Sequence, residues 1–138
     1  MDSSAGSVVR APLYAAFDGG PGSCVRARES AALFLNTLAA QTPAREAGAA
    51  DQVLLVVSEL VTNSVRHAPG PFVLILRAQP DGVRISVRDT SEVLPTPRTP
   101  DLVNGGGFGW PAIIQCLATD IDVVTHPGGK EIHAVLPW

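Results

Sequence analysis

Four short runs rich in β-branched residues lie in the second half of the chain and come as two adjacent pairs. Phe72 to Ala78 and Val83 to Arg88 flank a connection that contains Asp-Gly, a strong signal for a β-hairpin. Ile121 to Thr125 and Lys130 to Leu136 flank a Pro-Gly-Gly turn in the same way. Because a Rossmann fold needs single strands that alternate with helices, this pairing disfavours it and predicts antiparallel strands.

Two segments in the first half of the chain have the spacing of amphipathic helices. In the first, Val25 to Ala40, apolar side chains recur at helical intervals at Ala32, Leu35, Leu38 and Ala39. The second runs from Ala49 to about Ala68, and a Pro-Gly-Pro sequence ends it. One face of this second helix carries Val53, Val56, Val57, Leu60, Val61 and Ser64.

Three further segments complete the expected order. Val8 to Phe17 is predicted to be a strand that ends at a glycine-rich loop. Thr90 to Gly107 contains three prolines and three consecutive glycines, which favours a long loop of the kind that often forms a functional lid. Ile113 to Ala118 is predicted to be a short helix, with Pro111 in its first turn.

The fold class that follows is α+β: a two-layer sandwich of a mixed, mostly antiparallel sheet with helices on one face. The length of 138 residues fits one domain, and 46% hydrophobic residues with 17% charged residues is typical of a globular protein. We therefore expect a single domain over residues 1–138, with an N-terminal strand and loop over about 1–22 and the lid loop over about 90–107.

Charge and hydropathy exclude several classes of partner. The net charge of -3 and the pI near 5.5 argue against nucleic acid, whose binders usually carry a clustered basic face. The N-terminal sequence does not resemble a signal peptide, and no run of about 20 apolar residues could form a transmembrane helix, so we expect a cytoplasmic protein. Cys24 and Cys116 have no metal-ligand spacing, and we expect both to be reduced and buried.

Glu59, Asn63 and His67 are spaced by four residues and form a polar row beside the buried stripe of the second helix. The amide oxygen of Asn63 suits Mg²⁺, which prefers oxygen ligands. The carboxylate of Glu59, one turn earlier, could orient or deprotonate a nucleophile near the same cation. By spacing alone, an exposed polar row on an amphipathic helix is the favoured explanation of the pattern, because many surface helices carry such a row.

Two other sites have the same ambiguity when taken alone. Asp89 ends a strand and opens the long loop, where a carboxylate could accept a hydrogen bond from an amino group or simply stabilise a turn. The glycine-rich run from Asn104 to Trp110 could present backbone N–H groups to phosphate or act as a hinge before a helix. It is neither a P-loop nor a dinucleotide-binding fingerprint. No histidine cluster or serine nucleophile motif indicates a metalloenzyme or a serine hydrolase.

Together these segments resemble a known family. The run from Leu55 to Ala68, LVVSELVTNSVRHA, is similar to the N box of the GHKL-type ATPases, especially the small anti-sigma-factor serine kinases and their actinobacterial relatives. The strand end Val87-Arg88-Asp89 resembles the first glycine box, and Gly107-Phe108-Gly109-Trp110 resembles the later one. The run from Gly128 to Ala134 resembles the closing hairpin, and the similarity extends from about Cys24 to Trp138.

The resemblance implies the Bergerat, or histidine-kinase-like ATPase, fold and the cofactors ATP and Mg²⁺. Asn63 would coordinate Mg²⁺, Glu59 would be the catalytic base or would orient water, and Asp89 would bind the adenine amino group. Nucleotide contacts are also implied for Gly105, Gly107, Gly109, His67 and Lys130.

The implied function is that of a serine kinase that phosphorylates an anti-sigma-factor antagonist, an anti-anti-sigma-type protein, and binds a sigma factor, usually as a homodimer. The alternative is a non-catalytic protein-binding module of the same fold. Two departures favour the alternative: Ser91 and Val93 replace the glycines of the first box, and Trp110-Pro111 follows the later one.

Overall fold

The computed structural model describes residues 11–80, 82–91 and 112–138. In chain order the described residues form β1 (Leu13–Phe17), α2 (Ser23–Gln41), α3 (Ala49–His67), β2 (Phe72–Gln79), β3 (Gly82–Asp89), α4 (Ala112–Leu117), β4 (Asp120–His126) and β5 (Gly129–Pro137). This is the order expected from the sequence, and the bounds of α3 differ from the expected ones by one residue.

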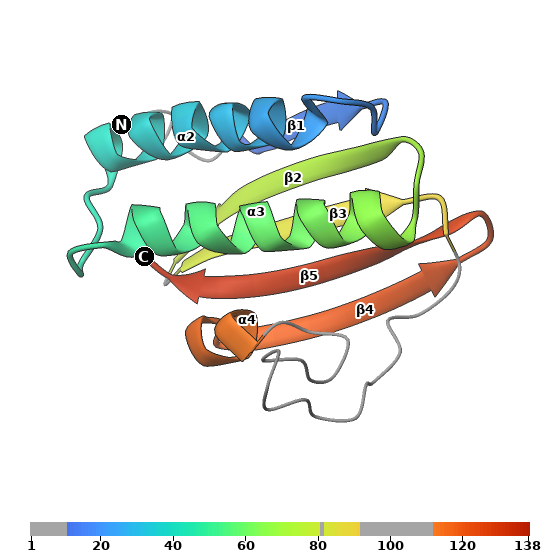
Figure 1. The fold of residues 1–138 in the computed structure, drawn as a ribbon. Helices are drawn as coiled ribbons and strands as arrows, with labels where there is room; N and C mark the ends of the chain where they lie inside the picture. The colour runs from blue at the N-terminus through green and yellow to red at the C-terminus, as the bar shows by residue number, and fades with distance from the viewer. Residues whose placement is uncertain (1–10, 81, 92–111) are drawn as a thin grey trace, which may run out of the picture.

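The described strands form one sheet in the order β1-β2-β3-β5-β4, so β3 is its central strand (Figure 1). Each strand pairs antiparallel with its neighbour, and both expected hairpins, β2 with β3 and β4 with β5, are present. No parallel pair occurs among these strands, so the sheet is more uniform than the mixed one predicted. The antiparallel α+β class is confirmed.

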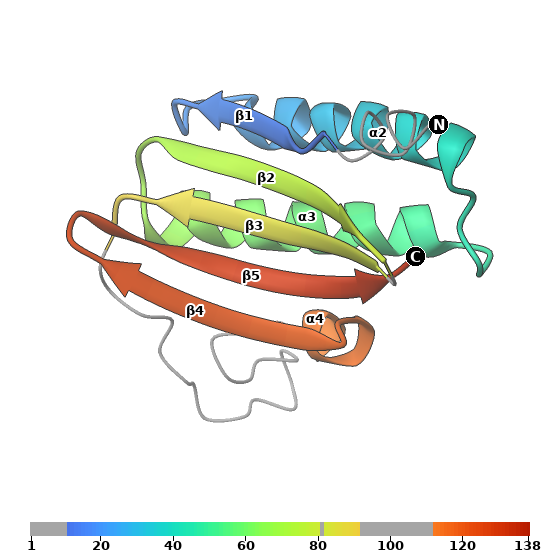
Figure 2. The same cartoon turned by 180° about the vertical axis from the view of Figure 1, so that it is seen from behind.

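The helices cover one face of the sheet. In Figure 1 α2 and α3 lie in front of the strands, and from behind, in Figure 2, the strands lie in front of the helices. The core fills the space between these layers. From α3 it takes the predicted apolar stripe, and from the sheet it takes alternate side chains of the central strands, including Leu74, Ile85 and Leu136. Burial on one face fixes the strand register, because a slip by one residue would expose the whole apolar set.

The buried face of α2 differs from the predicted one. Leu35 and Leu38 are buried as expected, but Ala27 and Ala31 accompany them in the core, whereas Ala32 is only half-buried and Ala39 is exposed. Alanines are small enough to fit either face of a helix, so their spacing could not decide which of them contacts the core.

The two cysteines are free, but the prediction that both are buried is wrong. Cys24 is half-buried, because the preceding Ser23 takes the fully buried position at the start of α2. Cys116 is exposed, since it lies two residues beyond the buried Ile114 and about 200° around the short helix α4. Within the described residues no helix is both long and apolar enough to span a bilayer.

The face of the sheet turned away from α2 and α3 carries a polar cluster across β3 and β5. Ser86 and His133 are cross-strand partners, and the Ser86 hydroxyl and His133 Nδ1 share a hydrogen bond of 2.6 Å. Arg88 donates to Glu131 Oε1 at 3.1 Å, and Glu131 Oε2 lies 3.7 Å from His133 Nε2. Burial lowers the pKa of His133 below its usual value, and the positive charge of Arg84 lowers it further.

This lowered pKa predicts that the protein loses stability as the pH falls below about 6.5, the ordinary pKa of histidine. Below that pH the His133 imidazole is protonated in the unfolded chain but stays neutral in the folded chain. The contribution of His133 is thus fully present above pH 6.5 and is lost as the pH falls towards the folded-state pKa. Urea denaturation at a series of pH values above and below 6.5 measures this change in the free energy of unfolding. His133→Asn should flatten the dependence and His126→Asn, at an exposed position, should not; an unchanged slope in His133→Asn would contradict the assignment.

Candidate functional site

The polar row of α3 borders the buried face of the helix, where the spacing predicts it. Glu59 and Asn63 are half-buried, whereas His67, in the last turn, is exposed. The helix forms here because Asp51 in its first turn and two basic residues in its last turn complement the helix dipole. Glu59 and Asn63 are therefore partly accessible to a ligand at the border of the buried face.

Asp89 occupies the last position of the central strand β3 and faces the helices. Its side chain is only 1% exposed. The backbone N–H of Ser91 donates to Oδ1 at 3.0 Å, which turns the chain away from the strand. A carboxylate so deeply buried needs charged or hydrogen-bonding partners, because desolvation strongly disfavours an isolated charge.

Lys130 supplies the opposite charge. It is the cross-strand partner of Asp89 on β5, and its Nζ donates to Oδ1 at 3.0 Å and to Oδ2 at 2.9 Å. The Lys130 side chain is itself only 6% exposed. The pair is a buried salt bridge in which one ammonium group bonds both carboxylate oxygens. Removal of either residue would leave the other as an uncompensated buried charge.

Ser64 ties α3 to this pair. Its hydroxyl donates to Asp89 Oδ2 at 3.3 Å, and its residue is 4% exposed. This bond brings the helix flank that carries Asn63 next to the end of β3. From its place on the helix, Ser64 is expected only to pack with the apolar stripe of α3. The missed signal is its position on the apolar stripe of α3, because a buried hydroxyl needs a hydrogen-bond partner.

Close backbone contacts hold the strand ends together around Asp89. A Cβ on Gly129 would lie 2.1 Å from the backbone oxygen of Asp89, so only glycine lets β5 begin against the end of β3. At the same end of the sheet, a Cβ on Gly19 would lie 2.2 Å from the backbone oxygen of Gly70. Two loops and two strands therefore converge on the edge of the candidate site.

Several predicted site residues lie outside the described residues. They are Gly105, Gly107 and Gly109, together with Val93 and nearly all of the predicted lid. The structure thus joins Ser64, Asp89 and Lys130 at one end of the α3–sheet interface. Asn63 precedes Ser64 on α3, and Glu59 lies one turn before Asn63 on the same helix.

The donor set fits a magnesium ion that is held mainly by its nucleotide. Among the described residues no group of three or more His, Cys, Asp or Glu side chains could hold a metal. Mg²⁺ commonly takes one or two protein oxygens and completes its shell with water and substrate phosphates. The half-buried amide of Asn63, one turn from the carboxylate of Glu59, can supply such a protein ligand.

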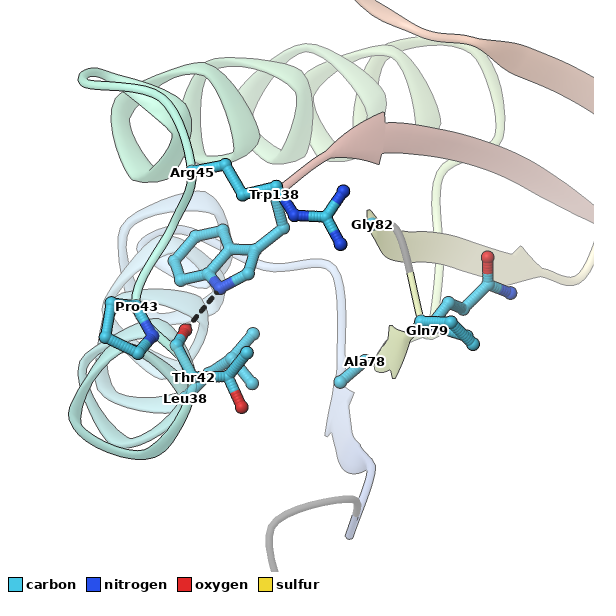
Figure 3. A pocket seen from close by; sticks show the side chains of 9 residues that line it. Leu38, Thr42, Pro43, Arg45, Ala78, Gln79, Gly82 and Trp138 are labelled. Atoms are coloured by element: carbon cyan, nitrogen blue, oxygen red, sulfur yellow. Dashed lines mark hydrogen bonds between the residues drawn. The ribbon is translucent and has the colours of Figure 1, made fainter. Parts of the chain in front are cut away.

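A separate hollow lies at the opposite end of the sheet (Figure 3). Its lining residues are Leu38, Thr42, Pro43, Arg45, Ala78, Gln79, Pro80, Gly82 and Trp138. Trp138 Nε1 donates to the backbone oxygen of Thr42 at 2.7 Å. About eight residues of extended chain separate this hollow from Lys130, roughly 26 Å. The hollow is therefore not part of the candidate site.

The family model of the histidine kinase-like ATPase domain matches residues 22–136, which is most of the chain. The chain belongs to the histidine kinase-like ATPase domain family. The resemblance stated from the sequence is confirmed, and membership of an ATPase family implies ATP as the ligand of this domain.

The fold of this histidine kinase-like ATPase domain is similar to that in the crystal structure of the RsbU and RsbW domains of Rv1364c from Mycobacterium tuberculosis. The TM-score is 0.61 at 20% sequence identity, and the match covers 92% of this chain. The domain spans only a third of that protein, since 33% of the other chain is covered. A comparison with curated proteins found no match.

Proposed function

We propose that this protein is an ATP-dependent regulatory serine kinase. It phosphorylates an anti-sigma-factor antagonist, an anti-anti-sigma-type protein, binds a sigma factor, and works in the cytoplasm as a homodimer. The observation that carries the proposal is the half-buried Glu59–Asn63 pair of α3, set beside the Ser64–Asp89 bond in a histidine kinase-like ATPase domain. The similarity to a structure that contains an RsbW domain supports the same regulatory class.

Each residue has a distinct part in this proposal. The amide oxygen of Asn63 would hold Mg²⁺, and the ion when bound would neutralise charge on the phosphates. Glu59 would accept the proton of the attacking serine hydroxyl. Asp89 would be the acceptor for the adenine amino group wherever its bond to Lys130 leaves a lone pair free. His67 is exposed at the end of α3 and would contact the nucleotide from the rim of the site, as would the glycines at 105, 107 and 109.

A second function is favoured by a specific observation. The Asp89 carboxylate is bonded to Lys130, Ser64 and Ser91, and Ser91 stands where the resembled family has glycine. Both features oppose close approach of a nucleotide base. A protein-binding module that keeps the fold without efficient phosphoryl transfer is therefore the alternative.

A thermal shift with ATP and Mg²⁺ separates these two functions. A ligand that binds only the folded state at about 100 times its Kd stabilises it by about 2.7 kcal/mol. For a domain of this size that corresponds to a rise in Tm of roughly 5–10 °C. ATP with a chelator in place of Mg²⁺ should give a smaller rise. No shift at millimolar ATP would count against the kinase and support the binding module.

A further inference from the structure

The Asp89 carboxylate has no acceptor position left for a ligand. Oδ1 accepts from Lys130 Nζ and from the Ser91 N–H, both at 3.0 Å. Oδ2 accepts from Lys130 Nζ at 2.9 Å and from the Ser64 hydroxyl at 3.3 Å. A carboxylate offers about four lone-pair sites, so these bonds use all of them.

Among these donors Lys130 holds the carboxylate most strongly. Its ammonium group bonds both oxygens, and charge-assisted bonds of this kind are shorter and stronger than neutral ones. The Ser64 bond is long for a hydroxyl donor, and it occupies one site on one oxygen only. An adenine amino group is a neutral donor, so it competes poorly with the ammonium group for the same lone pairs.

We propose that Lys130 is a specificity-determining residue that acts as an internal competitor for Asp89. While the salt bridge stands, the site binds a nucleoside triphosphate through its phosphates and does not select the exocyclic amino group of adenine. Removal of the ammonium group opens one lone pair on each oxygen and creates that selectivity. The inference rests on the proposed nucleotide binding and assigns the part of Lys130 in it.

The test compares two nucleotides in the full chain: ATP, and purine riboside triphosphate, which lacks the amino group. Isothermal titration with Mg²⁺ measures both Kd values. Wild type is expected to bind the two within about twofold. Lys130→Met keeps the length of the side chain and removes its donors. It is expected to bind ATP roughly ten- to a hundredfold more tightly than the analogue, as a hydrogen bond to a charged acceptor allows.

Two matched variants distinguish the proposed effect of Lys130 on nucleotide selectivity from a general loss of charge or packing. Arg88→Met removes a cation from the neighbouring position on β3, whose side chain is exposed and paired with Glu131, and should leave the ratio near that of wild type. Ser64→Ala frees a single lone pair of Asp89. It should raise the preference for ATP, given by the Kd of the analogue divided by the Kd of ATP, less than Lys130→Met does. If Lys130 is purely structural, Lys130→Met will have a lower Tm but the same ratio of the two Kd values as wild type.

The outcomes decide between the proposals. A wild-type preference for ATP of tenfold or more would overturn the inference, even if Lys130→Met does not fold. So would equal ratios in wild type and Lys130→Met. In both cases nucleotide binding itself would stand. If wild type binds neither nucleotide and Lys130→Met gains no binding, the nucleotide-binding proposal and this inference both fail.

Discussion

Replacement of Glu59 by glutamine is expected to lower the rate of phosphoryl transfer about 10²- to 10⁴-fold, the usual contribution of a positioned general base. The amide has the shape of the carboxylate but cannot accept the proton of the attacking hydroxyl. ATP affinity should change little, because the proposed contact to the Mg²⁺-bound phosphates comes from Asn63. Mass spectrometry measures the rate at which phosphoserine forms on an anti-anti-sigma-type partner. A titration of the same variant with ATP measures its affinity.

Two comparisons sharpen this result. Asp51→Asn removes a carboxylate from the exposed start of the same helix and should leave transfer unchanged. Asn63→Ala should instead abolish the Mg²⁺-dependent part of ATP binding, because it removes the proposed ligand of the ion. Equal losses of ATP binding in the Glu59 and Asn63 variants would contradict the division of parts between them.

Truncation of Trp138 to alanine is expected to cost about 3–5 kcal/mol of unfolding free energy, as for other large buried aromatic residues. The indole is 7% exposed and covers the core between β5 and the end of α2. Its N–H also bonds the backbone oxygen of Thr42, which anchors the connection between the two helices (Figure 3). Guanidinium denaturation monitored by circular dichroism gives the change in free energy.

Trp138→Phe divides this loss between packing and hydrogen bonding. Phenylalanine fills much of the same volume but leaves the Thr42 oxygen without this donor, so the loss should be about 1–3 kcal/mol. Leu33→Ala is the matched surface control, since Leu33 is 69% exposed and its truncation should change stability by about 0.5 kcal/mol or less. A loss of that small size in Trp138→Ala would refute the packing assigned to the indole.

Local sequence signals were sufficient for most of the fold. The face of α3 was predictable because large apolar residues repeat along it and a Pro-Gly-Pro sequence ends it. Both hairpins were predictable from their turns. The face of α2 was not, since several alanines satisfy the helical period and only contact with α3 and the sheet selects Ala27 and Ala31. The same competition among small residues produced the wrong burial of Cys24.

The candidate site was predictable only in part, for a reason of distance along the chain. Glu59 and Asn63 were placed correctly beside the buried stripe, because both lie on one helix. The salt bridge between Asp89 and Lys130 joins residues 41 positions apart, and it depends on the pairing of β3 with β5, which no local pattern encodes. The family resemblance implied a nucleotide contact for Lys130, but only the register of the two strands turns its side chain inward onto Asp89.

The central position of β3 also bears on how the domain folds. β3 is joined to its partner β2 by a tight hairpin, whereas about 40 residues separate it from its other partner, β5. Pairing with β5 therefore costs more loop-closure entropy. Non-local strand pairs of this kind slow folding. Asp89 meets Lys130 only when that second pairing is complete. Formation of the Asp89–Lys130 salt bridge therefore reports that the whole sheet has assembled, and not merely that its first hairpin and the helices have formed.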